Sequence, residues 1–407
     1  MNEIFNVAII GGGASGLLCA TELVSGDNAL SGNGVIVLER LDRVGKKLIA
    51  TGNGQGNLSN ANLSKEYYHG DGAFIDGFIN TAKALSLQDY FYNLGVPFIT
   101  VDDGRQYPLS KQASAVLDII RANLKVKGVT EKVDFCVTRI THCNGLFVIR
   151  SKDQIVLAKK VVLAVGGKAG SQFGTDGSSY ALAQNFGHSV TDLYPSLVQL
   201  KTEQDLVRGL KGLKEQVVAS AYDGEKKLAS CVGEVLFTDY GVSGNAIFKI
   251  SGAFASVKKP ILNLEFLPSL TLVQTEGLLA DRIKNVNYID KKDLLCAILN
   301  KRVGQAVLKT AKSLSPKDLA YAIKNFRLKV TGNTGFKNAQ VTKGGIRTNE
   351  IDIETYESKF QRGLYLAGEL LDVDGDCGGY NLTFAFVSGI TIARAIKNKW
   401  SGNYGKI

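Results

Sequence analysis

Residues 7–18 read VAIIGGGASGLL, a short apolar run followed by glycines and by the start of a helical pattern. The glycines at positions 11, 13 and 16 have the G-x-G-x-x-G spacing. A second apolar run, residues 35–38, leads directly to the acidic residue Glu39. A strand, a glycine turn, a helix and a second strand that ends in an acid are typical of a β-α-β unit that binds a dinucleotide.

Each key residue of this unit has a physical role in that interpretation. Gly11 allows the tight turn, Gly13 lets the backbone approach a pyrophosphate, and Gly16 lets helix and strand pack closely. The helix directs its first N–H groups and the positive end of its dipole at the phosphates. Glu39 stands where an acid can accept hydrogen bonds from ribose hydroxyls. The alternative is a tight turn in an α/β protein without nucleotide, but the flanking strand, helix and acid favour the dinucleotide.

The bulk composition indicates a globular protein of two or three domains. The chain has 407 residues, of which 45% are apolar and 21% charged, and its net charge is +10. This charge permits anionic partners. Six cysteines without a C-x-x-C pair indicate reduced thiols, with neither a disulfide framework nor a structural zinc site. We see no signal peptide and no run of about 18 apolar residues, so we expect a cytoplasmic protein without a membrane span.

The order of the patterns predicts an α/β fold with an interrupted nucleotide-binding domain. Residues 160–167 form a second apolar run that enters glycines, but no second G-x-G-x-x-G follows, unlike in two-dinucleotide reductases. We assign residues 1–194 and 335–407 to a Rossmann-like domain. Residues 195–265, with 330–334, form a β-rich insert, and residues 266–329 form a basic helical subdomain, with a helix start at Ser315-Pro316.

The helical segment 266–329 carries 12 Lys and Arg against 5 acids, which makes +7 of the chain's net charge of +10. One interpretation is an ordinary solvated face of helices. The other is a docking surface for a polyanion such as RNA, whose phosphates attract clustered cations. Few aromatic residues interleave these charges, so base stacking is not indicated. The charge favours RNA modestly and does not decide the question.

Two further glycine-rich segments have a composition suited to ligand contact. In residues 52–57, glycines alternate with small polar residues, which suits either backbone wrapped around a ligand or an ordinary surface loop. Residues 378–381 (Gly-Gly-Tyr-Asn) precede a helix over 382–397, whose N–H groups would point at an electron-rich ligand atom. The acids at 372, 374 and 376 do not fit the EF-hand spacing, so we predict no metal site.

The chain resembles the BaiN-like FAD/NAD(P)-dependent oxidoreductases, also called YhiN-like flavoproteins. The resemblance covers nearly the whole chain, and its most specific part is the end, with Gly368-Glu369 and then residues 378–381. The other matching blocks are the N-terminal fingerprint, residues 45–60, 104–108, 161–167, 233–238, 241–244 and 344–345. The chain departs from the family pattern in two places. Where G-x-G-R-C-N is common, residues 54–57 read Gly-Gln-Gly-Asn, without the Arg and Cys. It also has Asp239 where many members have His.

The resemblance implies a FAD-binding Rossmann-like domain built from both chain ends, a β-barrel-like insert and a helical subdomain. The first glycines would hold the pyrophosphate and Glu39 the ribose. Lys47 and the 52–57 loop would wrap the middle of the cofactor, Glu369 would lie beside the ribityl chain, and residues 379–381 would line the isoalloxazine. The candidate FAD-binding residues are Gly11, Gly13, Ala14, Ser15, Gly16, Glu39, Arg40, Lys47, Gly52, Asn53, Gly54, Asn57, Gly166, Gly368, Glu369, Gly378, Gly379, Tyr380 and Asn381.

The resemblance also implies a reaction. NAD(P)H would dock transiently and reduce FAD, which would pass a hydride to a C=C bond conjugated to a carbonyl. We name Cys377 as the first candidate proton donor and Tyr380 as the second, although Cys377 could simply fill a tight loop. The substrate would be a small enone of the steroid or bile-acid kind, or a uridine of ribosomal RNA that becomes dihydrouridine. The alternatives are a FAD-binding redox sensor or assembly factor without turnover, and a flavin-dependent RNA methyltransferase.

Overall fold

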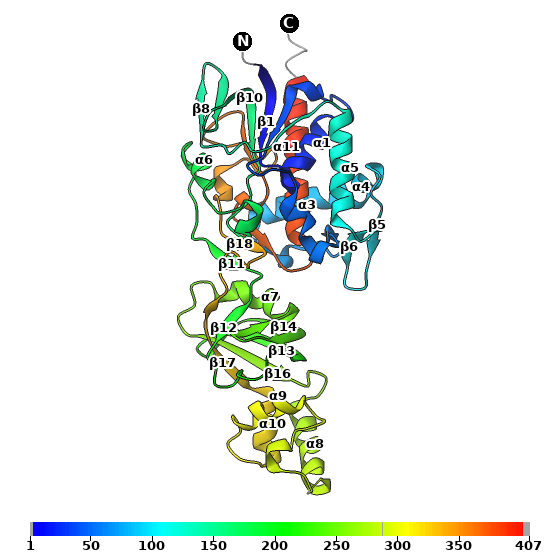
Figure 1. Cartoon of the computed structure of the whole chain (residues 1–407), viewed down its shortest axis with the longest axis vertical. Helices are drawn as coiled ribbons and strands as arrows, with labels where there is room; N and C mark the ends of the chain where they lie inside the picture. Colours follow the sequence, from blue (N-terminus) through cyan, green and yellow to red (C-terminus); the bar gives the residue numbers. More distant parts are fainter. Residues whose placement is uncertain (1–2, 287, 402–407) are drawn as a thin grey trace. The chain divides into compact units, whose positions relative to one another are not determined.

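The computed structural model describes residues 3–286 and 288–401 and divides the chain into two compact units (Figure 1). The first unit is Met1–Leu193 with Val341–Ile407, and the second is Tyr194–Gln340. Both ends of the chain therefore build one unit, and the middle builds the other. The predicted fold class is confirmed: a discontinuous Rossmann-like domain, an inserted barrel and additional helices.

The first unit is organised around a seven-stranded mixed sheet in the order β7-β2-β1-β10-β9-β8, with β19 also paired to β10. β1 (Ile4–Ile10) pairs in parallel with β2 (Val35–Leu38) and with β10 (Ile155–Leu163). Residues 7–10 and 35–38 are fully buried, as the continuous apolar runs of parallel strands require. The remaining strands are β7 (Thr130–Lys132), β8 (Arg139–Cys143), β9 (Leu146–Arg150) and β19 (Leu364–Leu366).

Helices from the two ends of the chain pack against each other in this unit. α1 (Ala14–Leu23) lies along α11 (Tyr380–Ser401), which starts two residues earlier than the sequence pattern indicates (Figure 1). The unit also contains α2 (Lys46–Ile49), α3 (Gly72–Leu85), α4 (Leu87–Asn93), α5 (Ala113–Val126) and α6 (Tyr180–Gln184). Over residues 3–286 and 288–401, none of the helices has the length and apolar composition that a bilayer crossing needs.

Short strands complete the first unit near the start of α11. β4 (Tyr68–Gly70) and β20 (Val373–Gly375) form an antiparallel pair. A separate three-stranded sheet has the order β3-β6-β5. Its strands are β3 (Ser59–Asn60), β5 (Phe98–Thr100) and β6 (Arg105–Pro108), and β18 (Val341–Lys343) begins the returning chain.

The second unit is a closed six-stranded barrel with helices. The strand order is β12-β15-β14-β13-β16-β17. The strands are β12 (Leu200–Thr202), β13 (Lys214–Asp223), β14 (Lys226–Phe237), β15 (Gly241–Ser243), β16 (Pro260–Phe266) and β17 (Phe326–Asn333), after β11 (Tyr194–Ser196). The helices are α7 (Asn245–Ser251), α8 (Leu272–Asn285), α9 (Lys301–Leu308) and α10 (Pro316–Lys324). The helical interpretation was wrong for residues 326–329, because they pair with β16 as part of β17.

The start of α10 follows the predicted capping pattern. Ser315 is the N-cap, and its Oγ accepts a hydrogen bond from the N–H of Asp318 at 3.2 Å. Pro316 occupies the first helical turn, where its missing N–H costs nothing. Local chemistry of this kind is readable from the sequence because every participant lies within a few residues.

The contact between α1 and α11 depends on glycines. A Cβ at Gly389 would lie 2.2 Å from the carbonyl oxygen of Ser15, and a Cβ at Gly368 would lie 2.8 Å from the Ser15 Oγ. Such distances are far below normal van der Waals contact, so only glycine allows this approach of the two segments.

We expect Gly389→Ala to lower the free energy of unfolding of the first unit by about 1–3 kcal/mol, because the added methyl overfills a backbone contact. Alanine would otherwise stabilise a helix relative to glycine. Thermal unfolding followed by circular dichroism measures the effect. The matched control is Gly72→Ala in α3, where a Cβ meets no atom within 4 Å. Equal melting temperatures for the two variants would contradict the packing argument.

Candidate functional site

The glycine turn after β1 has the geometry that a bound pyrophosphate requires. Gly11 has φ +105°, and a Cβ there would lie 2.2 Å from the carbonyl oxygen of Ala164. A Cβ at Gly16 would lie 2.0 Å from the carbonyl oxygen of Gly11. Gly13 differs, because a Cβ there would meet no atom within 4 Å. The turn therefore needs glycine for its own packing at 11 and 16, and leaves open space at 13 where a ligand can approach the backbone. Ala14 and Ser15 then begin α1.

Glu39 is held in place at the end of β2. Its Oε2 accepts a hydrogen bond from the N–H of Gly12 at 2.9 Å, and its Oε1 accepts one from the N–H of Leu41 at 2.9 Å. Each carboxylate oxygen can accept a further bond, so the fixed carboxylate remains suited to ribose hydroxyls. The side chain thus orients the glycine turn, and its contact with a ribose stays a prediction.

Arg40 contacts the loop after β10. Its Nη1 donates to the carbonyl oxygen of Gly174 and to Oδ1 of Asp176, both at 3.0 Å. Burial raises the pKa of Asp176, but hydrogen bonds from Ser178 and Arg40 outweigh it and bring that pKa to about 2. The guanidinium is therefore engaged by this loop, and a cofactor contact by Arg40 stays a prediction.

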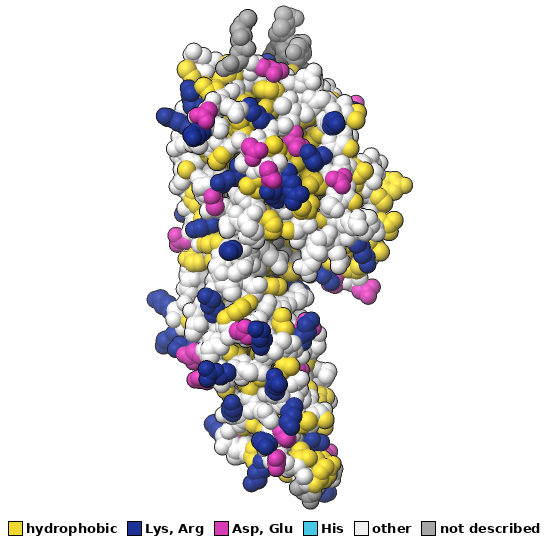
Figure 2. Space-filling model, in the orientation of Figure 1, with side chains coloured by type: hydrophobic (Ala, Val, Ile, Leu, Met, Phe, Trp, Pro, Cys, Tyr) yellow, Lys and Arg dark blue, Asp and Glu magenta, His cyan; other side chains and the backbone are white. Residues whose placement is uncertain are grey.

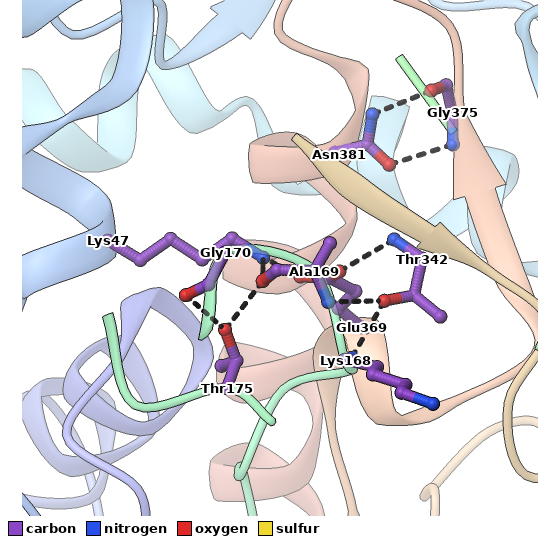
Figure 3. A network of polar contacts seen from close by, with 9 residues as sticks. All are labelled: Lys47, Lys168, Ala169, Gly170, Thr175, Thr342, Glu369, Gly375 and Asn381. Atoms are coloured by element: carbon purple, nitrogen blue, oxygen red, sulfur yellow. Dashed lines mark hydrogen bonds and ion pairs between the residues drawn. The ribbon is translucent and has the colours of Figure 1, made fainter. Parts of the chain in front are cut away.

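A polar network joins four segments of the first unit (Figure 3). Lys47 Nζ donates to Glu369 Oε2 at 2.6 Å and to the carbonyl oxygen of Ala169 at 3.0 Å. Glu369 Oε1 accepts the N–H of Thr342 at 2.9 Å. The Oγ1 of Thr342 accepts the N–H groups of Lys168 and Ala169 at 2.7 and 2.9 Å. Lys47 and Glu369 are thereby fixed together although they are 322 positions apart. Both are predicted to contact the middle of the cofactor.

The same network folds the glycine loop after β10 into a compact turn. Thr175 Oγ1 donates to the carbonyl oxygen of Ala169 at 2.6 Å, a bond drawn in Figure 3. Gly166 has φ +71°, and a Cβ there would lie 2.9 Å from Cγ2 of Thr175. The candidate residue Gly166 therefore has a clear backbone reason to be glycine.

The loop predicted to wrap the cofactor has a left-handed backbone. Gly52, Asn53 and Gly54 have φ values of +56°, +54° and +87°. A Cβ at Gly52 would lie 3.0 Å from the N atom of Asn57. These three positions are not buried, so the backbone is accessible to a ligand.

The double glycine before α11 is held by residues of β3. Gly378 and Gly379 have φ values of +152° and +100°, and a Cβ at Gly379 would lie 2.4 Å from the carbonyl oxygen of Ser59. Asn60 Nδ2 donates to the carbonyl oxygen of Gly378 at 2.9 Å. The hydroxyls of Ser59 and Thr383 are 2.9 Å apart. The sequence reasoning missed Ser59, Asn60 and Thr383 as supports of this loop, because they act across more than 300 residues.

Asn381 supports the loop through its side chain. Its Oδ1 accepts the N–H of Gly375 at 2.8 Å, and its Nδ2 donates to the carbonyl oxygen of Gly375 at 2.6 Å (Figure 3). The amide is therefore occupied by the end of β20. Contact with a flavin from this position would come from backbone N–H groups in the first turn of α11, which have no partner within the helix.

The two candidate proton donors have different surroundings. Tyr380 is 5% exposed, and its ring stacks on that of Tyr67 with centroids 4.6 Å apart. Burial raises the pKa of Tyr380 well above its ordinary value. Cys377 is partly exposed in the loop between β20 and α11. Among the residues described, no disulfide joins the cysteines, and no group of three or more His, Cys, Asp or Glu side chains is placed to hold a metal ion.

Comparisons with known proteins agree with this geometry. The family model of the HI0933-like protein Rossmann domain matches residues 5–395. A 3-dehydro-bile acid delta(4,6)-reductase of Clostridium scindens is 35% identical over 405 residues, covering 96% of this chain and 98% of that protein. A ribosomal RNA dihydrouridine synthase of Escherichia coli is 27% identical over 412 residues, covering 95% and 96%.

A solved structure supports the fold. The 3-ketosteroid-delta4-(5alpha)-dehydrogenase of Rhodococcus jostii aligns with a TM-score of 0.51 at 15% identity, covering 97% of each chain. At this identity the likeness concerns the fold alone. With the family match, it shows a Rossmann-like fold of the FAD-binding kind, and the open position at Gly13 fits that cofactor.

We expect Gly13→Ala to leave the melting temperature of the apoprotein within about 2 °C of the wild type, since the methyl enters open space. The FAD affinity should fall roughly 10-fold or more, because the same methyl would lie where the pyrophosphate approaches. Fluorescence titration of the apoprotein with FAD measures the affinity. Wild-type affinity in this variant would exclude Gly13 from the cofactor contact.

We expect Thr342→Val to lower the free energy of unfolding by about 2 kcal/mol or more, because two buried backbone N–H groups lose their acceptor. FAD retention should fall with it, since the same loop meets Lys47. Thr342→Ser keeps the hydroxyl and serves as the matched control. Denaturant unfolding and the FAD content after gel filtration are the two measurements. A valine variant that behaves like the serine variant would contradict the role of the hydroxyl.

Proposed function

This chain belongs to the family of HI0933-like proteins with a Rossmann domain, and from that premise we propose that it is a FAD-dependent reductase of C=C bonds conjugated to a carbonyl. The preferred substrate class is a small steroid-like enone, and NAD(P)H is the transient reductant. The observation that carries the proposal is that segments from both ends of the chain meet: Ser15, beside the open glycine turn, lies close to Gly368, and Lys47 of α2 pairs with the next residue, Glu369, at 2.6 Å. This arrangement supports an extended cofactor. One end of it would contact residues from the N-terminal part of the chain, and the other end would contact residues from the C-terminal part.

The residues of the chain divide the work of holding this cofactor. FAD, when bound, supplies the two-electron chemistry, and the protein supplies orientation and electrostatics. The turn at Gly13 and the N-terminus of α1 receive the phosphates, and Glu39 receives a ribose. Lys47 and Glu369 lie at the middle of the cofactor. The first turn of α11 stabilises negative charge that develops on the ring system.

A nicotinamide cofactor fits this scheme as a visitor. The sequence contains one G-x-G-x-x-G turn. The second apolar run that leads into glycines, residues 160–167, is not followed by another. We therefore propose that NADH or NADPH reduces FAD and leaves before the substrate binds. The nicotinamide donor and the enone would then occupy one position in turn. We therefore expect ping-pong kinetics.

The basic segment 266–329 supports RNA less than its charge suggests. Lys324 is 7% exposed and donates to Glu265 at 3.1 Å and to two backbone carbonyls. Arg327 and Lys329 pair with Glu225 and Glu203 at 2.8 Å.

Those three acids lie outside the segment, so its surplus charge is partly neutralised by the barrel. Arg282 donates to the carbonyl oxygens of Leu294 and Cys296, and Lys301 pairs with Asp293 at 3.0 Å. Figure 2 shows Lys and Arg spread over the visible face with acidic and apolar side chains between them.

The more similar relative is also the reductase of a small molecule. The relative named for 3-dehydro-bile acid reduction is 35% identical, against 27% and 25% for two relatives named ribosomal RNA dihydrouridine synthases. These two relatives make a uridine of ribosomal RNA the second candidate substrate. Both candidates contain an alkene conjugated to a carbonyl, so the same flavin chemistry would serve either.

We expect the purified protein to show a flavin absorption band without added ligand, and to be reduced anaerobically by NADH or NADPH. A 3-oxo steroid with a conjugated double bond should then reoxidise it, and the saturated analogue should not. Stopped-flow spectroscopy measures both half-reactions.

Three other results would each point elsewhere. No reduction by either donor would favour a FAD-binding sensor or assembly factor. Reoxidation by ribosomal RNA fragments, with no response to the enone, would favour uridine as substrate. Methyl transfer to RNA from a folate would identify the methyltransferase alternative.

A further inference from the structure

A histidine and two carboxylates meet beside the loop that precedes α11. β4 and β20 pair so that His69 stands opposite Asp374. Because directly opposed residues of an antiparallel pair point to the same face, these two side chains share one face of the ribbon. His69 Nε2 also lies 2.9 Å from Oδ1 of Asp376. The backbone N–H of Asp376 is itself held by the carbonyl oxygen of Tyr67 at 2.9 Å.

The cluster adjoins the candidate flavin contacts. Asp376 is followed by Cys377, the two glycines and the first turn of α11. The side chain of Asn381 clasps Gly375 by two hydrogen bonds, so the strand that carries Asp374 is fixed to the helix start. The imidazole is reachable, because the His69 side chain is 45% exposed, whereas Asp374 is only 3% exposed.

The charges around His69 favour its protonated form. The hydrogen bond to Asp376 is the largest influence and raises the pKa of His69. Burial lowers this pKa, the charges of Asp374 and Asp376 raise it, and that of Lys343 lowers it. Lys343 belongs to β18, which packs beside β20.

The pKa of Asp374, the buried carboxyl of the cluster, is raised as well. Burial raises the pKa of Asp374 to about 6, against the opposing charges of His69 and Lys343. The charges of Asp372 and Asp376 add to the increase. The cluster therefore combines an imidazole shifted toward its protonated form with a buried carboxyl that is also shifted toward its protonated form.

We propose that His69 is the proton donor of the reductase reaction, with Asp376 and Asp374 as positioning residues. This inference rests on the function proposed above. The carbon farther from the carbonyl would receive a hydride, the chemistry that reduced FAD supplies when bound, and the C=C π bond would break. The adjacent carbon takes a proton from Nδ1–H of the imidazolium. Neutral His69 keeps the proton on Nε2, which is held by Asp376, and recovers its Nδ1 proton from water.

The test uses the holoprotein and compares its two half-reactions. In His69→Gln, reduction of FAD by NAD(P)H should proceed at the wild-type rate, while reoxidation by the enone should slow about 100-fold or more. His142→Gln is the matched control, because His142 is an exposed histidine on β8, an end strand of the seven-stranded sheet, to which neither β4 nor β20 belongs. It should match the wild type in both half-reactions.

A second readout does not depend on turnover. The chain has three histidines, so ¹⁵N-histidine NMR can follow each one through a pH titration. Asp376→Asn should lower the pKa of His69, and Asp374→Asn should lower it less, because a charge contributes less than the hydrogen bond.

Because the raised pKa keeps His69 protonated to higher pH, reoxidation by the enone should decline with rising pH through that pKa. In Asp376→Asn, the decline should move to lower pH.

The outcomes separate the two levels of the argument. If reduced wild-type protein is not reoxidised by the enone, the proposed function fails, and the role of His69 fails with it. If the wild type turns over but His69→Gln reoxidises within about 3-fold of it and keeps the same pH profile, His69 is not the donor and the reductase function stands. A His69 pKa unchanged in Asp376→Asn would overturn the positioning role of Asp376.

Discussion

The close approach of two glycines to Ser15 determines how the first unit is put together. Gly368 meets the side chain of Ser15 and Gly389 meets its backbone, at distances that leave no room for a Cβ. Ser15 lies in the first turn of α1, two residues after the open position Gly13. Gly368 precedes Glu369, and Gly389 lies in α11. The glycine turn after β1 and α11 are therefore placed relative to each other by close contact, which permits little variation in their spacing.

The polar network of Lys47, Glu369 and Thr342 depends on that placement. Buried ion pairs gain little net stability, because the cost of removing both charges from water offsets their attraction. Here the Lys47 and Glu369 side chains are 27% and 19% exposed, and both carboxylate oxygens of Glu369 have partners. The gain is one of specificity: the network is satisfied in a single arrangement of four chain segments. An extended cofactor lying across these segments would find its contacts already formed.

The parts of the fold that the sequence predicted are those with local causes. The turn at Gly11, Gly13 and Gly16 and the cap at Ser315 each involve residues a few positions apart, and their chemistry is visible in the sequence. Asn60 and its partner Gly378 are 318 residues apart, and no local pattern links them. The partners that partly neutralise segment 266–329 could not be predicted for the same reason, because Glu203 and Glu225 reach it from connections between the barrel strands. The start of β17, residues 326–329, was assigned to the helices because it continues their basic composition, whereas residues 330–334 were assigned to the β-rich insert.

The question of the proton donor shows what the fold adds to a motif. Sequence position favours Cys377 and Tyr380, because both adjoin the double glycine. A general acid works best when its pKa lies near the pH at which the enzyme operates. Burial moves the pKa of Tyr380 away from that range, since the phenolate would lose its water. An imidazole starts near that range, and the hydrogen bond to Asp376 raises the pKa of His69 while its side chain stays 45% exposed. Strand pairing, which brings His69 to within 2.9 Å of a residue 307 positions later, therefore supplies a better acid than the adjacent sequence does.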